Sequence, residues 1–78
     1  MTDPRPPEVR MAEDIASQFR HLPDDDAVAS VLNHVTMFWD PRMRARLVSL
    51  VASAPGPIDP VVVRVADALA VRGAPAQA

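Results

Sequence analysis

The stretch FWDPRMR, residues 38–44, decides the fold because it joins two helical segments with almost no connector. Asp40 has a side chain typical of a helix N-cap, and Pro41 is a residue favoured at the first helical position. Proline also disfavours helical geometry in the residue before it, so we expect the chain to turn sharply at Asp40. One helix should therefore end near Trp39, and the next should start at Pro41.

Apolar residues recur at helical spacing on both sides of this turn. Before it, one ridge carries Val28, Leu32, Val35 and Trp39, and a neighbouring ridge carries Ala27, Val31, His34 and Phe38. After it, the apolar stripe consists of Met43, Leu47, Leu50, Val51 and Ala54. Because the helix before the turn has the wider apolar face, we expect it to be the centre of the fold.

Prolines mark the remaining joints of the chain. A first helix is expected from Pro7, and its apolar face is predicted to be Met11, Ile15, Phe19 and Leu22. In LPDDDA, residues 22–27, Asp24 or Asp25 is predicted to be the N-cap of the second helix.

A last helix is predicted after the break APGPIDP, residues 54–60. The following VVVRV, residues 61–65, has strand-like propensity. However, the Asp59-Pro60 start and the continuation ADALAVR favour a helix. Its apolar face is expected to be Val62, Val65, Ala66 and Leu69.

The sequence thus predicts an all-α protein, a small bundle of three to four short helices with disordered termini. With 78 residues there is room for one core, so we expect a flexible leader over 1–6, one helical domain over 7–72 and a disordered tail over 73–78. The chain has no cysteine, which excludes disulfides and thiolate metal sites.

Composition and motifs exclude most kinds of active site. His21 and His34 lie on different predicted segments without metal-ligand spacing, and the chain has no glycine-rich loop or nucleophile elbow. We therefore expect no catalytic, cofactor-binding or metal-binding residues. No apolar run approaches the roughly 20 residues of a membrane span, and the start lacks signal-peptide features, so a cytoplasmic protein without membrane contact is expected.

Two function classes remain for the residues around the turn. Aromatic and arginine side chains are enriched at binding hot spots, so His34, Phe38, Trp39, Arg42 and Arg46 form a predicted partner interface, although Trp39 also aligns with a core ridge. The alternative is a small helix-turn-helix-like nucleic-acid-binding regulator that uses PRMRAR, residues 41–46. The formal net charge of −2 and the very short connector argue against nucleic acid.

Several segments resemble a known family. MAEDIASQF, PDDDA, HVTMFWDPRMRARL and PGPIDPVVVRVADAL, between Met11 and Leu69, are similar to the delta subunit of cytoplasmic, molybdenum-containing, NAD-dependent formate dehydrogenases. The resemblance implies a non-catalytic accessory subunit that supports assembly, stability or maturation of the catalytic complex. It also implies that the molybdenum cofactor, iron–sulfur clusters and FMN belong to the larger subunits, and that the molybdenum-bearing alpha subunit is the main partner.

Overall fold

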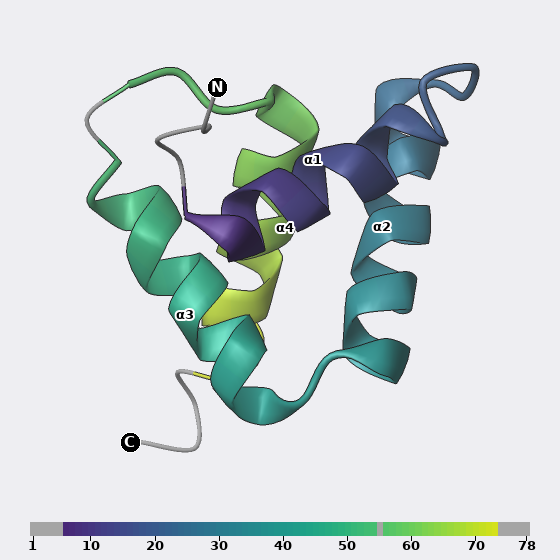
Figure 1. Cartoon of the computed structure of the whole chain (residues 1–78). Helices are drawn as coiled ribbons and strands as arrows, with labels where there is room; N and C mark the ends of the chain where they lie inside the picture. The colour runs from purple at the N-terminus through teal and green to yellow at the C-terminus, as the bar shows by residue number, and fades with distance from the viewer. Residues whose placement is uncertain (1–5, 55, 74–78) are drawn as a thin grey trace.

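The computed structural model describes residues 6–54 and 56–73, and this part of the chain forms four α-helices and no strand (Figure 1). The helices are α1 (Pro7–Ser17), α2 (Asp24–Phe38), α3 (Pro41–Ala52) and α4 (Pro60–Gly73). The predicted all-α bundle is confirmed. Residues 1–5 of the predicted leader and 74–78 of the predicted tail lie outside the described residues.

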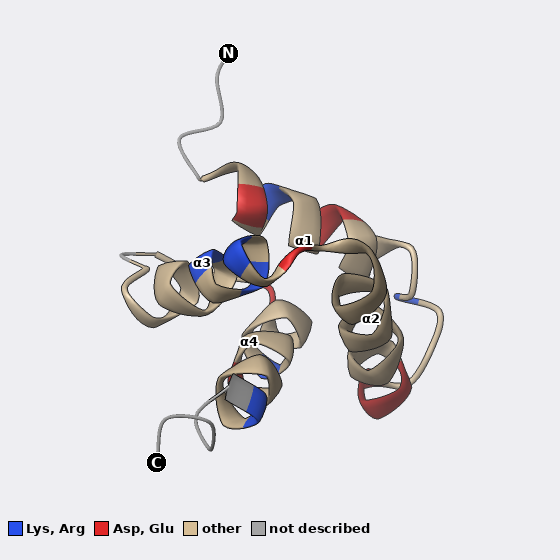
Figure 2. Ribbon diagram, turned by 90° about the horizontal axis from the view of Figure 1, so that it is seen from below, with Lys and Arg blue, Asp and Glu red and all other residues tan. Residues whose placement is uncertain are grey.

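The helix α4 is the centre of the bundle. It lies between α2 and α3 and also packs against α1, whereas α2 and α3 meet little beyond the turn that joins them (Figures 1 and 2). The prediction that α2 is central is wrong, because α4 packs closely against all three other helices, whereas α2 does not pack closely against α3. Tertiary packing also decides the conformation of the valine-rich segment, which is helical despite its strand propensity.

The core is apolar and is supplied by all four helices. The largest fully buried side chains are Leu47, Val31, Val35, Val62 and Val65. Around them pack the half-buried Met43, Leu50, Val51 and Leu69. This confirms the apolar stripe predicted for α4 and most of the stripe predicted for α3, whose last member, Ala54, lies beyond the end of α3 at Ala52. No helix in the described part of the chain combines the length and the apolar composition needed to cross a membrane.

The apolar face of α1 differs from the predicted one. Met11 is 44% exposed, and the helix ends at Ser17, so Phe19 lies beyond it in a turn where its amide donates to the Ala16 carbonyl. The buried face instead carries Val9, Ala12, Ile15 and Ala16. Small alanine side chains allow neighbouring helices to approach closely, and a search for large apolar residues overlooks them.

The start of α2 also differs from the prediction. Its N-cap is Pro23 rather than Asp24 or Asp25, and no side chain caps it. The Pro23 carbonyl accepts a hydrogen bond from the Ala27 amide at 2.9 Å, so the helical bonding begins one residue earlier than expected. Asp24 and Asp25 consequently lie in the first turn, where their charges favour the positive end of the helix dipole.

The turn between α2 and α3 has the predicted geometry. Trp39 is extended, with ψ of 141°, and its amide donates to the Val35 carbonyl at 3.0 Å. The Asp40 carboxylate then accepts a hydrogen bond from the Met43 amide at 2.9 Å, which confirms Asp40 as the N-cap of α3. Two residues are therefore enough to end one helix and start the next.

The start of α4 is fixed by Asp59, whose side chain is largely buried. Its carboxylate accepts a hydrogen bond from the Val61 amide at 2.9 Å and pairs with the Arg20 guanidinium. The Asp59 amide donates to the Glu13 carboxylate at 3.1 Å. These contacts tie the start of the central helix to α1 and to the turn that follows it.

Candidate protein-interaction surface

Large apolar side chains are exposed at the end of α2. Phe38 is 70% exposed and Met37 is 66% exposed, and the two are neighbours in the chain. The half-buried His34 ring lies against the Phe38 ring, with 4.8 Å between ring centroids and 43° between ring planes. We call His34, Met37 and Phe38 the α2-end patch.

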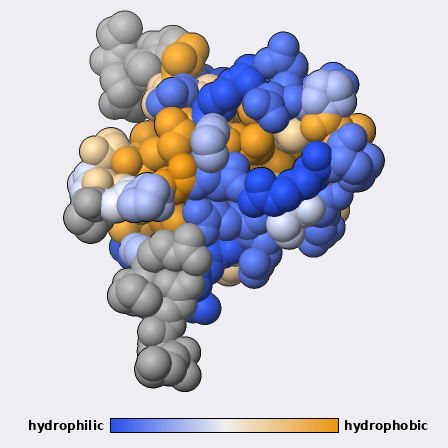
Figure 3. Space-filling view, turned by 90° about the horizontal axis from the view of Figure 1, so that it is seen from above, coloured by the Kyte–Doolittle hydropathy of each residue, from blue (hydrophilic) through white to orange (hydrophobic). Residues whose placement is uncertain are grey.

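A second apolar region lies around the end of α3, and its residues are less exposed than Met37 and Phe38. Figure 3 shows apolar surface on the left of the molecule, the side on which α3 ends and the connection to α4 runs in Figure 1. The apolar residues of this part of the chain, such as Leu50, Val51 and Ile58, are only half-exposed and pack against the core. The side chains of Met37 and Phe38 are far more exposed, so the α2-end patch is the stronger candidate for a contact surface.

Trp39 is buried, whereas its neighbour Phe38 is exposed. The Trp39 side chain is only 6% exposed and belongs to the core with Val35 and Leu47. The extended backbone at Trp39 turns its side chain inward at the point where α2 ends. Of the two neighbouring aromatic residues, Trp39 thus belongs to the core and only Phe38 is available to a partner.

The two predicted interface arginines have different surroundings. Arg46 is exposed and donates through Nε to the Glu8 carboxylate at 2.9 Å, which joins α3 to α1. Arg42 is exposed and has no hydrogen bond or ion pair with another described residue. A hydrogen bond from the backbone lowers the pKa of the Glu8 carboxyl, desolvation opposes this, and the Arg46 guanidinium lowers the pKa further.

Charged residues also link other parts of the chain that lie far apart in sequence. Acidic residues occur on α1 and at the start of α2, and basic residues gather on α3 (Figure 2). Besides the Arg46–Glu8 pair, Arg64 on α4 donates to the Asp25 carboxylate at 2.7 Å. Because at least one partner in each pair is exposed, each pair contributes little to the stability of the fold.

Arg44 has a role that the sequence did not reveal. It is half-buried, and its guanidinium donates to the Thr36 backbone carbonyl at 2.8 Å. This carbonyl belongs to the last turn of α2, where backbone acceptors lack partners within the helix. The only signal in the sequence was the position of an arginine in the first turn of the next helix.

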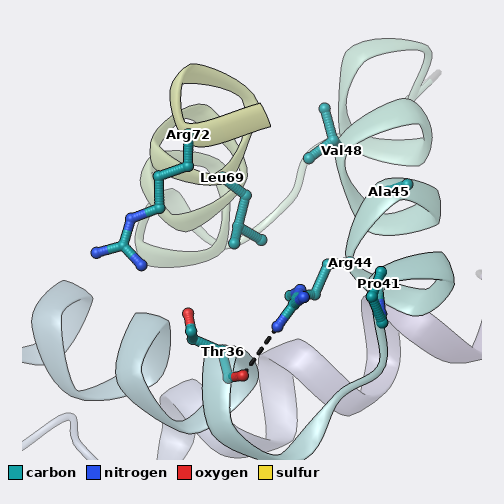
Figure 4. A pocket seen from close by; sticks show the side chains of 7 residues that line it. All are labelled: Thr36, Pro41, Arg44, Ala45, Val48, Leu69 and Arg72. Carbon is teal, nitrogen blue, oxygen red and sulfur yellow. Dashed lines mark hydrogen bonds between the residues drawn. The ribbon is translucent and has the colours of Figure 1, made fainter. Parts of the chain in front are cut away.

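A pocket of about 340 Å³ opens beside this contact, between the end of α2, the start of α3 and the end of α4 (Figure 4). Its apolar lining consists of Pro41, Ala45, Val48 and Leu69, and its polar lining consists of Thr36, Arg44 and Arg72. The Thr36 hydroxyl oxygen is buried and has no hydrogen-bond partner among the described residues. In Figure 4 this hydroxyl points from α2 toward the α4 wall.

The described residues contain no group of three or more His, Asp or Glu side chains that could hold a metal ion.

Residues 9–66 match the model of the family described as NADH-dependant formate dehydrogenase delta subunit FdsD. The chain belongs to this family. Its partners are therefore the other subunits of formate dehydrogenase. No curated protein and no solved structure gives a significant match to the chain.

The family match covers most of the residues discussed above. It includes the α2-end patch, Trp39 and the arginines of α3, and it ends within α4 before Arg72. The sequence pointed to His34 and Phe38 as interface residues, and Met37 was not among the five predicted. The sequence did not single out Arg44, Thr36 or Arg72 as lining of a common pocket, because no local pattern brings α2, α3 and α4 together at that point.

Proposed function

We propose that this delta subunit is a non-catalytic accessory subunit that supports the assembly, stability or maturation of the molybdenum-containing alpha subunit. The α2-end patch is its main contact surface. The observation that carries this proposal is the exposure of Met37 and Phe38, two large apolar residues that are neighbours at the end of α2. Methionine and aromatic side chains are typical of binding surfaces.

The proposed interface also includes charged residues at the start of α3. Arg42 begins this helix four positions after Phe38 and can donate to a carboxylate of the partner. Arg46 offers its remaining N–H groups, since the Glu8 carboxylate is bonded to Nε. Five interface residues were expected from the sequence. Of these, Trp39 is buried in the core of the subunit, and the other four are proposed to contact the larger subunit.

The absence of catalysis by this subunit is part of the same proposal. His34 is engaged with an aromatic ring rather than with a nucleophile, and His21 is exposed on a turn. From the membership in the delta-subunit family, we also propose that the molybdenum cofactor, the iron–sulfur clusters and FMN belong to the larger subunits and that the complex is cytoplasmic. A nucleic-acid-binding role is not favoured, because Arg44 and Arg46 already have partners within the chain.

Replacing Phe38 by alanine is expected to reduce recovery of the larger subunits with a tagged delta subunit by about tenfold or more, as for a binding hot spot. The stability of the delta subunit should not change, because Phe38 is largely exposed. Co-purification from cells that produce the whole complex measures this. Met11→Ala, which shortens an exposed apolar side chain on α1, is the control and should co-purify normally. Normal recovery with Phe38→Ala would overturn the assignment.

A further inference from the structure

The pocket between α2, α3 and α4 contains a hydrogen-bonding group without a partner. The Thr36 hydroxyl oxygen is buried there and is bonded to no described residue. Buried polar atoms are nearly always satisfied, because leaving one without a partner costs free energy. The Arg44 guanidinium donates to the Thr36 backbone carbonyl at 2.8 Å, so it lies against the residue that carries the hydroxyl.

The charge of the pocket is positive although the chain has a formal net charge of −2. Both ionisable residues that the described part of the chain contributes to the lining, Arg44 and Arg72, are arginines, and none of the described lining residues is acidic. Arg44 uses one N–H group for the Thr36 carbonyl, which fixes the guanidinium and leaves its other donors available. A hydroxyl and two guanidinium groups together are suited to an anionic acceptor.

The size and the walls of the pocket restrict the ligand further. A volume of about 340 Å³ is at the lower end of the range for small-molecule sites and suits a short segment of polypeptide. Pro41, Val48 and Leu69 form an apolar wall beside the donors. A carboxylate side chain next to an apolar residue would satisfy both parts of the pocket.

We propose that the pocket receives a glutamate or aspartate side chain of a larger formate dehydrogenase subunit, with an apolar neighbour of that residue against Leu69. This inference rests on the proposed function and adds a second contact to it. The carboxylate accepts hydrogen bonds from Arg44 and from the Thr36 hydroxyl, and Arg72 adds charge at the rim. The pocket then fixes the orientation of the subunit, whose main contact is the α2-end patch.

A competition experiment tests the pocket. Wild-type and variant delta subunits with different tags are produced together with the larger subunits, and mass spectrometry measures their ratio in the purified complex. Arg72→Gln and Thr36→Val are each expected to be incorporated about tenfold less than the wild type. Arg64→Gln is the control, since it removes the same charge from the same helix outside the pocket, and it should stay within twofold. Thermal unfolding should find Thr36→Val at least as stable as the wild type, because it removes an unsatisfied hydroxyl.

The outcomes separate this inference from the proposed function. If the wild-type delta subunit is incorporated and both pocket variants compete equally with it, the pocket assignment is wrong and the α2-end patch is unaffected. If the wild type itself is not incorporated, the proposed function fails.

A second measurement identifies the chemistry of the ligand. The peptide acetyl-Leu-Glu-Leu-amide is expected to shift the NMR signals of the Arg44 and Arg72 side-chain N–H groups, whereas the same peptide with glutamine is not. Equal shifts with both peptides, or tighter binding of inorganic phosphate, would contradict a site for a partner carboxylate.

Discussion

Replacing Trp39 by alanine is expected to lower the free energy of unfolding by about 3–5 kcal/mol, the usual cost of truncating a buried aromatic residue. Small domains have total stabilities of roughly 5–15 kcal/mol, so this loss is a large fraction of the total. The reason is the position of Trp39, which is 6% exposed and lies at the point where α2 ends and α3 begins. Its loss leaves a cavity in the core beside the turn.

Urea unfolding followed by circular dichroism measures this effect without relying on tryptophan fluorescence. Phe38→Ala is the matched control, because it truncates the neighbouring aromatic residue at an exposed position. Its free energy of unfolding should stay within about 0.5 kcal/mol of the wild type. Equal destabilisation by the two variants would mean that Trp39 and Phe38 are not divided between core and surface.

Replacing Leu47 by alanine is expected to lower the free energy of unfolding by about 2–5 kcal/mol. Leu47 is fully buried and is the largest of the fully buried side chains. It projects from α3 into the core that α3 shares with the central helix α4. Removing it should therefore weaken the packing of the two helices that lie side by side.

Leu47→Met is the control for this second prediction. Methionine keeps most of the volume of leucine, so its cost should be below about 1.5 kcal/mol. The same urea titration compares the two variants. If alanine and methionine at position 47 give the same midpoint, the core does not depend on the volume of this side chain.

Local sequence patterns predicted the parts of the fold that depend on local chemistry. The Asp40-Pro41 step specifies a turn because the cap and the fixed proline dihedral act within four residues. The same reasoning gave α4 as a helix, although its valines favour strand. The face of α1 was predicted only in part: Ile15 was expected to be buried and is, but the completely buried Ala12 was missed, because alanine is a weak signal of burial in a sequence.

Local patterns could not predict contacts between residues that are far apart in the sequence. The pair Arg46–Glu8 joins residues 38 apart, and Arg64–Asp25 joins residues 39 apart, so neither follows from helical spacing. For the same reason the pocket that Arg44 and Arg72 line was not predicted. The different burial of Phe38 and Trp39 could be predicted, since the two residues lie on different ridges of α2 and therefore face different sides.

The most direct measurement is a photocross-link from position 38 in the assembled complex. A photoreactive phenylalanine analogue, benzoylphenylalanine, replaces Phe38 in one sample and the exposed Met11 in the other. Cross-links from position 38 to the molybdenum-bearing alpha subunit, and few or none from position 11, are the predicted result. Cross-links from position 11 but not from position 38 would contradict the proposal that the α2-end patch is where this delta subunit meets its partner.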